Sequence, residues 1–436
     1  MSALQDLVAP TTVVNVMDTE PDSLNMDCCN IKDFSYETIQ SLGNKVRLSD
    51  SNDKGLELYC YLHCNASDNE TLQQCRGVVV HNQKIVMKAF PYTIEYDHDD
   101  QENISKNIEP IFNGCKFFEA YEGALIRMFY FDNQWYVCTH RKLNAFRSKW
   151  ASSESFGTCF KKALLEELNY NKEFYDACYS EENNDNILDR FQSTLDITKQ
   201  YMFLVRHSKE NRIVCEVPTG NISKVYHVGT FINGELDMTD KCLLNYPTQK
   251  FFDSLDDLKN FVGNIDVKKL QGIIVFTPNN KQFKINHKEY NELFKIRGNE
   301  PSIKFRYLQI RMTRRSLNIL YYLYPEMHTT FDEIENSIYD IARNIYSSYI
   351  QRFIKKRFVT VPIEEFAVIR ECHSWHEEDR VHNRISLEKV ISILNKQSPT
   401  AINHMIRRLK VERDQKKNDT KIIDRKKRSS TITSES

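Results

Sequence analysis

The spacing of apolar residues changes once along this 436-residue chain, from a pattern typical of strands to one typical of helices. This change limits the folds that the chain can adopt. From about residue 55 to 310, short runs rich in Val, Ile, Phe and Tyr are broken by polar turns, a pattern typical of β-strands. After about residue 312, apolar residues recur every three or four positions, as on one face of an α-helix. We therefore expect an α+β protein in which antiparallel sheet is followed by a smaller helical domain.

Two hairpins are the clearest elements of the β-rich part. Residues 78–80 and 85–87 are apolar runs separated by His81-Asn82-Gln83, and residues 124–131 and 135–139 flank Asp132-Asn133. Asn and Asp favour the tight turns that join antiparallel strands. Further strands are expected at residues 201–205, 212–217, 272–276 and 282–285, and helices at residues 156–168 and 255–262.

The helical part has its own start signals. Thr330, with Glu333 three residues later, is the pattern of a capping box and predicts that a helix begins there. A second helix is expected from Ser386 to Leu394, and Pro399 marks a break after it. The apolar positions of the first helix are Ile334, Ile338, Ile341, Ile345, Tyr349 and Phe353.

Charge is balanced over the whole chain but not along it. Lys and Arg number 59 against 60 Asp and Glu, and this formal net charge of −1 excludes a uniformly basic nucleic-acid binder. Residues 1–35 carry six acids and one base, whereas residues 407–428 carry eleven bases and four acids. The predicted domains are an acidic, loosely ordered leader at 1–35, the β-rich domain at 36–311, the helical domain at 312–406 and a basic, Ser/Thr-ending tail at 407–436.

Composition excludes several classes of protein. Gly and Pro number only 12 and 11, which excludes collagen-like and Gly- or Pro-rich disordered chains. No apolar run reaches 18 residues and the start lacks a basic, apolar leader, so neither a membrane helix nor a secretory signal is expected. Twelve scattered Cys indicate reduced thiols in an intracellular compartment. Two clusters offer metal-ligand types, Cys60-His63-Cys64 and Cys372-His373-His376, but buried thiols are the preferred interpretation and no metal site is predicted.

Four segments carry the chemistry of the β-rich domain. They are Cys75-Arg76-Gly77 with the hairpin after it, Glu119 to Arg127 with Thr139 to Lys142, Tyr201 to Val205 with Glu210 to Val214, and Leu270 to Val275 with Phe283 to Asn286 and Tyr290. In order and separation they resemble the nucleotidyltransferase domain of RNA ligases of the T-even phage type, over about residues 70–300. The resemblance implies an antiparallel-sheet, ATP-grasp-like ligase domain, in which a lysine attacks the α-phosphate of ATP with the help of Mg²⁺.

The same resemblance shows where the family's chemistry is altered. Ala120 stands at the position of the nucleophilic lysine, and Lys116 is displaced by about 13 Å along an extended strand. Leu204 stands where the family has a ribose-contacting carboxylate, Gln271 where it has a metal-associated Glu, and Asn286 where it has the second phosphate-contacting lysine. The resemblance therefore implies the ligase fold and argues against ligase activity.

Five positions are candidates for binding phosphate or nucleotide, and three of them, Arg76, Gly123 and Lys284, match the family's pattern. The five positions are Arg76, Gly123, Arg127, Lys142 and Lys284. Further cations nearby are His140, Arg141, Arg147 and Lys149. Such cations hold a nucleic-acid backbone, but ordinary solvated strand charges are an equally open interpretation. Trp135 and Trp150 either stack on bases or pack in the sheet, and packing is preferred.

Two further basic stretches follow, one bridging the predicted β-rich and helical domains and one in the tail. Arg297 to Arg315 carries several cations that either follow a nucleic-acid backbone or pair with acidic neighbours. The basic tail favours polyanions, and its Arg425 to Arg428 run fits a nuclear-targeting patch.

Three functions stay open on this evidence. The preferred one is an RNA-ligase-like pseudoenzyme that binds RNA or DNA backbone, or nucleotide, without adenylylation and without a cofactor. The second is an active ATP-dependent RNA ligase with a displaced nucleophile, which requires ATP and Mg²⁺. The third is a structural or virion-associated protein with a virion or host protein partner. The Glu122 to Arg127 and Thr139 to Lys142 elements also resemble those of uncharacterised proteins of large DNA viruses. This resemblance implies an intracellular viral protein in the cytoplasm, nucleus or virion, and we expect no membrane partner.

Overall fold

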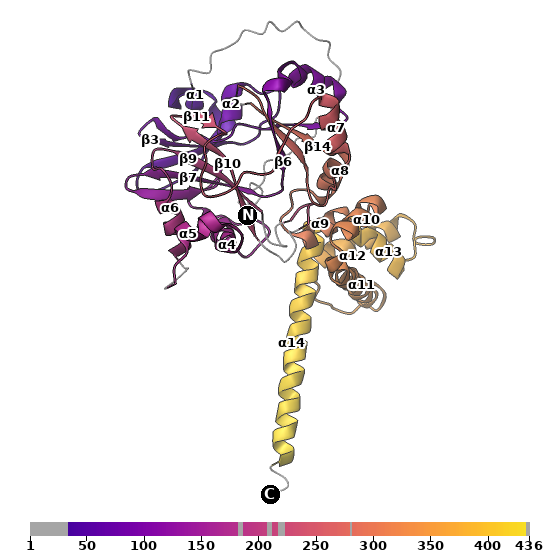
Figure 1. Cartoon of the computed structure of the whole chain (residues 1–436). Coiled ribbons are helices and arrows are strands. Elements are labelled where there is room, and N and C mark those ends of the chain that lie inside the picture. Colours follow the sequence, from indigo (N-terminus) through magenta and orange to yellow (C-terminus); the bar gives the residue numbers. More distant parts are fainter. Residues whose placement is uncertain (1–33, 182–185, 207–211, 217–222, 280, 433–436) are drawn as a thin grey trace. The chain divides into compact units, whose positions relative to one another are not determined.

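The computed structural model describes residues 34–181, 186–206, 212–216, 223–279 and 281–432 (Figure 1). All but the last two residues of the predicted acidic leader lie outside the described residues. The chain divides into two compact units between Pro301 and Ser302. We call them the β-rich unit and the helical unit. The division comes ten residues before the predicted boundary, because Ile303–Ile310 forms a helix that packs within the helical unit.

The β-rich unit contains three sheets whose strands are antiparallel except for one parallel pair, β14 with β5. The first sheet has the order β1 (Val46–Ser51), β2 (Leu56–Tyr61), β3 (Arg76–His81), β4 (Lys84–Met87). The second has the order β11 (Glu235–Asp237), β10 (Lys224–Ile232), β9 (Gln200–Arg206), β7 (Ala124–Phe131), β8 (Gln134–Cys138). The third has the order β12 (Gln249–Lys250), β6 (Lys116–Ala120), β13 (Gly272–Phe276), β14 (Gln282–Asn286), β5 (Ile94–Asp97). The predicted α+β class with antiparallel sheet is confirmed.

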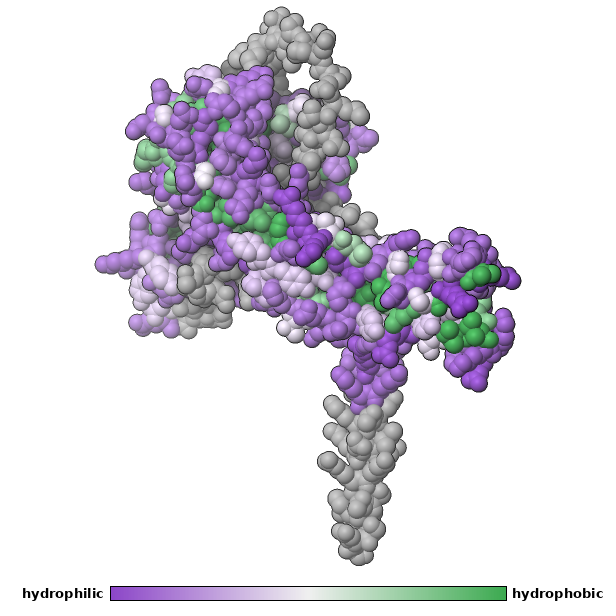
Figure 2. Space-filling model, turned by 90° about the vertical axis from the view of Figure 1, so that its right-hand side faces the viewer, coloured by the Kyte–Doolittle hydropathy of each residue, from purple (hydrophilic) through white to green (hydrophobic). Residues whose placement is uncertain are grey.

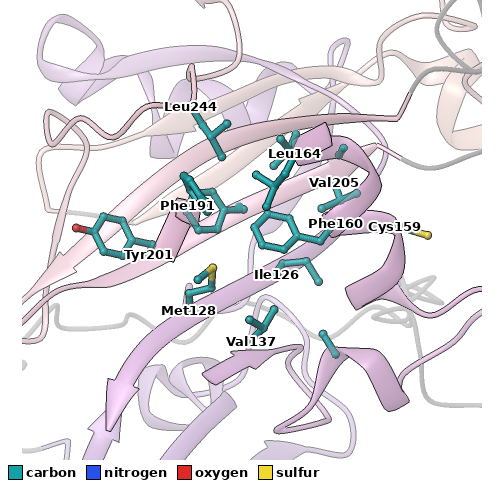
Figure 3. Close-up of a cluster of buried hydrophobic side chains, with 14 of the residues drawn as sticks. Ile126, Met128, Val137, Cys159, Phe160, Leu164, Phe191, Tyr201, Val205 and Leu244 are labelled. Atoms are coloured by element: carbon teal, nitrogen blue, oxygen red, sulfur yellow. The ribbon is translucent and has the colours of Figure 1, made fainter. Parts of the chain in front are cut away.

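Helices cover the sheets and separate the core into layers. On the second sheet, Phe160 and Phe191 from the helices pack against Phe203 of β9. Figure 3 shows Phe160 and Phe191 in this cluster, beside Tyr201 and Val205 of the same strand. In the third sheet, neighbouring side chains point to opposite faces, so Phe117 packs with the helical layer while Phe118 packs between the second and third sheets. The helices of this unit are α1 (Tyr36–Ser41), α2 (Glu70–Gln74), α3 (Gln101–Asn107), α4 (Phe156–Tyr170), α5 (Lys172–Cys178), α6 (Ile187–Ser193), α7 (Leu255–Gly263) and α8 (Lys288–Arg297).

Both predicted hairpins are confirmed, as are strands β9, β13 and β14 and helices α4 and α7. The turn residues Asn82 and Gln83 have φ of 47° and 64°, and Asp132 and Asn133 have φ of 49° and 59°. Two consecutive positive φ angles match the right-handed twist of the flanking strands, which explains why these turns close the hairpins.

One predicted strand is wrong. Residues 212–216 form bends rather than a strand, and Val217 lies outside the described residues. The reason is that the backbone amides of Ile213 and Val214 donate to the carboxylate of Glu122 instead of a neighbouring strand. The strand that pairs with β9 here is β10, which we did not predict.

The helical unit contains α9 (Ile303–Ile310), α10 (Arg314–Leu323), α11 (His328–Tyr349), α12 (Ile363–Glu378), α13 (Leu387–Leu394) and α14 (Pro399–Ile432). The predicted apolar series of α11 is buried from Ile334 to Tyr349, which confirms that helix. Its predicted start at Thr330 is wrong, because the turn Pro325–Met327 runs directly into the helix at His328. Ser386 caps α13 by accepting from the amide of Lys389.

A partly buried ion pair joins helices of this unit. Arg311 donates from Nε and Nη2 to the two carboxylate oxygens of Glu335 on α11, both at 2.7 Å. Its third nitrogen donates to Asn395 after α13 at 2.8 Å, and Tyr307 donates to Glu335 at 2.8 Å. Of the two open interpretations of the 297–315 stretch, pairing with an acid holds for Arg311. In the part of this chain that the structure describes, no helix combines the length and hydrophobicity of a membrane span.

The cysteines are distributed through the core layers. The ten described thiols are free, and eight of them are buried. Cys64 and Cys75 pack with the first sheet, Cys138 lies between sheets, Cys159 lies on the buried face of α4, and Cys372 lies in the helical unit. Burial raises the pKa of the Cys64, Cys75, Cys138 and Cys372 thiols. Within the described ranges no group of three or more His, Cys, Asp or Glu side chains is arranged to hold a metal.

Candidate phosphate-binding cavity

A cavity of about 310 Å³ is lined by residues from all three sheets of the β-rich unit. It contains six of the positions that the sequence singled out: Arg76, Ala120, Gly123, Leu204, Gln271 and Lys284. Three others, Arg127, Lys142 and Asn286, do not line it. The structure thus gathers residues of β3, β6, β9 and β14, together with the residues directly before β7 and β13, into one site.

Ala120 lies on the cavity wall at the end of β6. It pairs with Gly272 of β13, and its side chain is 1% exposed. Side chains on a strand alternate, so Ala120 shares a face with Phe118, which also lines the cavity. Lys116 does not reach the site. Among the described residues that line the cavity, Lys284 is the only lysine.

Lys284 is held by partners on both sides. Its Nζ lies 2.7 Å from Glu95 Oε1 and 3.1 Å from Gln271 Oε1. The second carboxylate oxygen of Glu95 accepts from Asn286 at 3.0 Å, and Asn286 also donates to Asn291 at 2.9 Å. Glu95 was missed from the sequence, since β5 and β14 are almost 190 residues apart and no local pattern connects them. The Lys284 charge is therefore balanced within the cavity wall.

Arg76 is held loosely at the start of β3. Its Nη1 donates to the carbonyl of Pro91 and to Thr93 Oγ1, each at 3.4 Å. Thr93 in turn donates to Gln282 at 3.1 Å. Long hydrogen bonds to neutral partners leave the guanidinium free to accept a better anionic partner.

His140 does not add positive charge to the part of the cavity around Arg76. Burial, together with the cations of Arg76, Arg141 and Arg127, lowers the pKa of His140 well below its usual range. The ring is therefore neutral near pH 7, and the positive charge at this edge of the cavity comes from the arginines.

Glu122 organises the opposite wall. Its carboxylate accepts from the amides of Ile213 at 3.1 Å and Val214 at 2.8 Å, and from Tyr290 Oη at 2.9 Å. One side chain thus fixes the 212–216 segment to α8. Gly123 follows it, and a Cβ built there would lie 2.5 Å from the carbonyl oxygen of Val205. Only glycine permits this approach of β7 to β9.

A cation–aromatic stack stands at the rim. The guanidinium of Arg206 lies 4.6 Å above the Tyr121 ring, which stacks on Tyr226 at 5.1 Å. Tyr121 donates to Glu119, which also pairs with Lys250 at 3.1 Å. Burial opposes ionisation of Glu119, but these hydrogen bonds outweigh it and lower its pKa.

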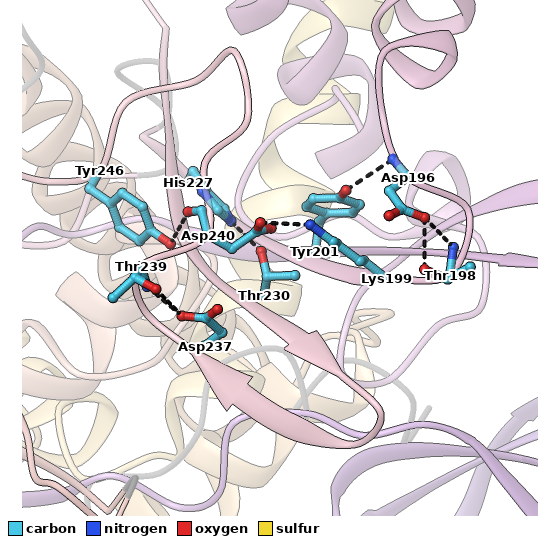
Figure 4. Close-up of polar contacts among 10 residues, drawn as sticks. All are labelled: Asp196, Thr198, Lys199, Tyr201, His227, Thr230, Asp237, Thr239, Asp240 and Tyr246. Carbon is cyan, nitrogen blue, oxygen red and sulfur yellow. Dashed lines mark hydrogen bonds and ion pairs between the residues drawn. The ribbon is translucent and has the colours of Figure 1, made fainter.

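A polar cluster contacts the cavity wall through Tyr246 (Figure 4). Tyr246, which lines the cavity, donates to the carbonyl of Asp240 at 2.8 Å and packs against the His227 ring at 4.5 Å. The carboxylate of Asp240 pairs with Lys199 at 2.7 Å, and His227 lies 2.9 Å from Thr230 Oγ1. These contacts fix the wall without adding charge to the cavity.

The structure places two predicted phosphate ligands elsewhere. Arg127 is fully buried, and its guanidinium donates to the carbonyls of Gly77 and Thr139, so it joins β3 to the end of β8. Lys142 pairs with Asp50 at 3.3 Å, outside the cavity.

Other cations and rings have structural surroundings. Arg297 is fully buried, donates to the carbonyl of Glu300 at 2.6 Å, and lies 5.4 Å from the Trp150 ring. Trp150 is itself buried, and Trp135 packs against the core of the second sheet. Arg147 and Lys149 are exposed and do not line the cavity.

No protein-family model matches the chain. It is 27% identical over 420 residues to the immediate-early protein ICP-46 homolog of Invertebrate iridescent virus 6, a match that covers 90% of each chain. It is 26% identical over 408 residues to the homolog of Invertebrate iridescent virus 3, covering 90% of this chain and 84% of that one. The chain is similar to these viral proteins along most of its length.

Solved structures that match part of the chain include ATP-dependent ligases, with low TM-scores. A putative ATP-dependent DNA ligase from Aquifex aeolicus has a TM-score of 0.38 and 13% identity, covering 68% of this chain and 73% of that chain. An archaeal ATP-dependent RNA ligase has a TM-score of 0.37 and 8% identity, covering 69% and 76%. The expected similarity to viral proteins is confirmed by the two iridescent virus relatives.

Proposed function

We propose that the cavity binds a nucleotide, or the phosphate backbone of a nucleic acid, without becoming covalently adenylylated. The observation that carries this proposal is Ala120, which lies on the cavity wall where the resemblance implies a nucleophilic lysine. A methyl group has no atom that can form a phosphoramidate. Lys284, the only lysine among the described lining residues, is engaged by Glu95 and Gln271.

Binding would rest on charge and shape. Arg76 supplies a guanidinium whose present hydrogen bonds are long, and Lys284 supplies a second cation that can exchange Gln271 for a phosphate oxygen. Aromatic side chains, among them Phe118, Tyr246 and Phe276, supply the apolar lining that suits a planar base. The volume of about 310 Å³ lies at the small end of the range for ligand pockets.

The carboxylates that line the cavity do not fit a protein-held Mg²⁺. Glu95 pairs with Lys284, Glu119 with Lys250, and Glu216 with Lys268 at 3.2 Å. Glu122 accepts three hydrogen bonds from backbone amides and Tyr290. Since Mg²⁺ needs freely placed oxygen ligands in octahedral geometry, we derive no step through a metal.

The test separates binding from chemistry. The purified chain is incubated with α-labelled ATP and Mg²⁺, and covalent label is sought on a denaturing gel, while non-covalent binding is measured by calorimetry. We expect no covalent label, and binding that Arg76→Gln weakens about tenfold, as expected for one lost charge-assisted hydrogen bond. Arg147→Gln, an exposed cation outside the cavity, is the matched control.

Two results would favour the alternatives. A covalent band that disappears in Lys284→Arg would show an active ligase with a displaced nucleophile. Absence of binding to both ATP and oligonucleotides at physiological salt would leave the structural, virion-associated role.

A further inference from the structure

The connection between α11 and α12 presents unusual side chains to solvent. After the π-helical turn Ile350–Ile354, the chain runs without helix or strand to Pro362. We call residues 354–363 the basic-aromatic loop. Phe358 is 91% exposed, Ile363 80% and Ile354 63%, and the three cations Lys355, Lys356 and Arg357 are exposed between them. Figure 2 shows such hydrophobic residues among the hydrophilic surface of the helical unit.

The loop has a defined backbone. The amide of Lys355 donates to the carbonyl of Ile350, and that of Arg357 to the carbonyl of Gln351, both at 2.9 Å. Lys356 has a φ of +52°, a conformation that glycine or asparagine usually supplies. A lysine at such a position is strained, and strain of this kind is concentrated at functional sites.

The three cations have no acidic partner among the described residues. No side-chain hydrogen bond or ion pair of the described part joins Lys355, Lys356 or Arg357 to another residue. The acids that follow in the chain, Glu364 and Glu365, instead pair with Arg408 of α14. The loop is therefore a local positive patch around an exposed aromatic ring.

We propose that the basic-aromatic loop binds single-stranded nucleic acid, with Phe358 stacked on a base and the cations on the adjacent phosphates. Proteins that bind single strands combine these two features, because every base has an aromatic face and every nucleotide a charge. A duplex buries its base faces in the stack, so it can use only the cations.

A lipid surface is the main competitor for this chemistry. Anionic headgroups also attract Lys and Arg, but interfacial anchoring draws on a continuous apolar face. Here Ile354 and Phe358 are separated by three consecutive cations. The inference does not depend on the cavity, since the loop belongs to the helical unit alone.

The decisive substitution changes the ring without changing its hydrophobicity. The full chain is titrated into fluorescent 15-nucleotide oligo-U and oligo-dT, and binding is followed by anisotropy. Phe358→Leu should weaken binding by a factor between about 5 and about 150, the range for loss of one base stack, while Phe358→Trp should retain it. Tyr339→Leu, a half-exposed aromatic on α11, is the control and should leave affinity unchanged.

The charge contribution is read from salt dependence. Replacing Lys355, Lys356 and Arg357 by Gln should reduce the slope of log affinity against log salt by about 2, that is, about 0.7 for each lost phosphate contact. The matched triple variant, with Gln at the exposed Lys304, Arg314 and Lys396, removes equal charge elsewhere and should change the slope much less.

The Lys356→Gly variant separates an effect on nucleic-acid binding from an effect on the stability of the fold. Glycine relieves the positive φ, so the melting temperature should rise while the salt slope falls by about 0.7.

Three outcomes would overturn the inference. The first is wild-type affinity in Phe358→Leu, and the second is equal affinity for a duplex of the same length. The third is loop-dependent binding to phosphatidylserine vesicles that Phe358→Leu retains, which would assign the loop to a membrane surface. The Arg76→Gln variant keeps the two proposals apart, because it alters ATP binding and leaves the effect of Phe358→Leu intact.

Discussion

His227 is a fully buried histidine on β10 whose protonation the fold opposes. Burial lowers the pKa of His227 to about 4, although the carboxylate of Asp240 and the backbone of Gly229 act in the opposite direction. The ring packs against Tyr246, which lines the cavity, so its charge state bears on the cavity wall.

The sign and size of the effect follow from linkage. Between pH 6.5 and pH 4, His227 is protonated in the unfolded chain and neutral in the folded chain. The free energy of unfolding therefore falls as the pH falls. A pKa of about 4 in the folded chain against 6.5 in the unfolded chain corresponds to a loss of about 3 kcal/mol at full protonation. At pH 5 about 2 kcal/mol of this loss has developed, and at pH 7.5 almost none.

The assay compares two chains, one that keeps His227 and one that carries His227→Gln. The glutamine is neutral and can still form a hydrogen bond with Thr230. Both carry Trp375→Phe, so that the remaining tryptophans, Trp135 and Trp150, report only on the β-rich unit. Urea unfolding is followed by fluorescence from pH 7.5 to pH 5. We expect the wild type to lose about 2 kcal/mol more than His227→Gln over this range.

Comparing how the free energy of unfolding changes with pH in the two chains cancels the contributions of the other titrating groups. His140 is one of them, and its lowered pKa acts in the same direction. The comparison also cancels any constant destabilisation by the substitution. Parallel stability curves, within about 0.5 kcal/mol over the whole pH range, would refute the reasoning.

Two further predictions concern packing and charge. Gly123→Ala should lower the free energy of unfolding of the β-rich unit by about 1–3 kcal/mol and weaken ATP binding, because its Cβ would lie 2.5 Å from the Val205 carbonyl oxygen; unchanged urea unfolding would contradict this. Arg311→Ala should destabilise the helical unit by about 2 kcal/mol, less than a fully buried pair because Glu335 is 40% exposed. Arg380→Ala, which breaks an exposed pair, should change thermal unfolding by under about 0.5 kcal/mol, and equal effects of the two variants would argue against burial as the cause.

Local chemistry predicted the hairpins well. Asn82 and Asp132 stand in two-residue turns whose geometry is set by the residues themselves. The strand expected at residues 212–217 failed because an apolar run says nothing of where its amides donate, and Glu122 lies about 90 residues away. The expected cap at Thr330 failed because the preceding turn extends the helix toward its N-terminus.

The sequence predicted only those residues of the candidate site that lie in the motifs resembling the ligase family. Ala120, Gln271 and Lys284 were expected together, and they line one cavity. Arg127 has the same charge as Arg76 and was predicted to share its role, yet it is fully buried between backbone carbonyls. Burial depends on the packing of distant strands, so side-chain type alone does not distinguish a ligand-binding cation from a structural one.

The buried thiols make the opening of each core layer measurable by chemistry. An alkylating reagent reacts with a thiolate that has reached solvent, so Cys75, Cys138, Cys159 and Cys372 each react only when the layer around them opens. Their relative alkylation rates, resolved by peptide mass, would rank the free energies of opening of four separate layers in one sample. The chain thus carries its own set of probes for the order in which its sheets and its helical unit come apart.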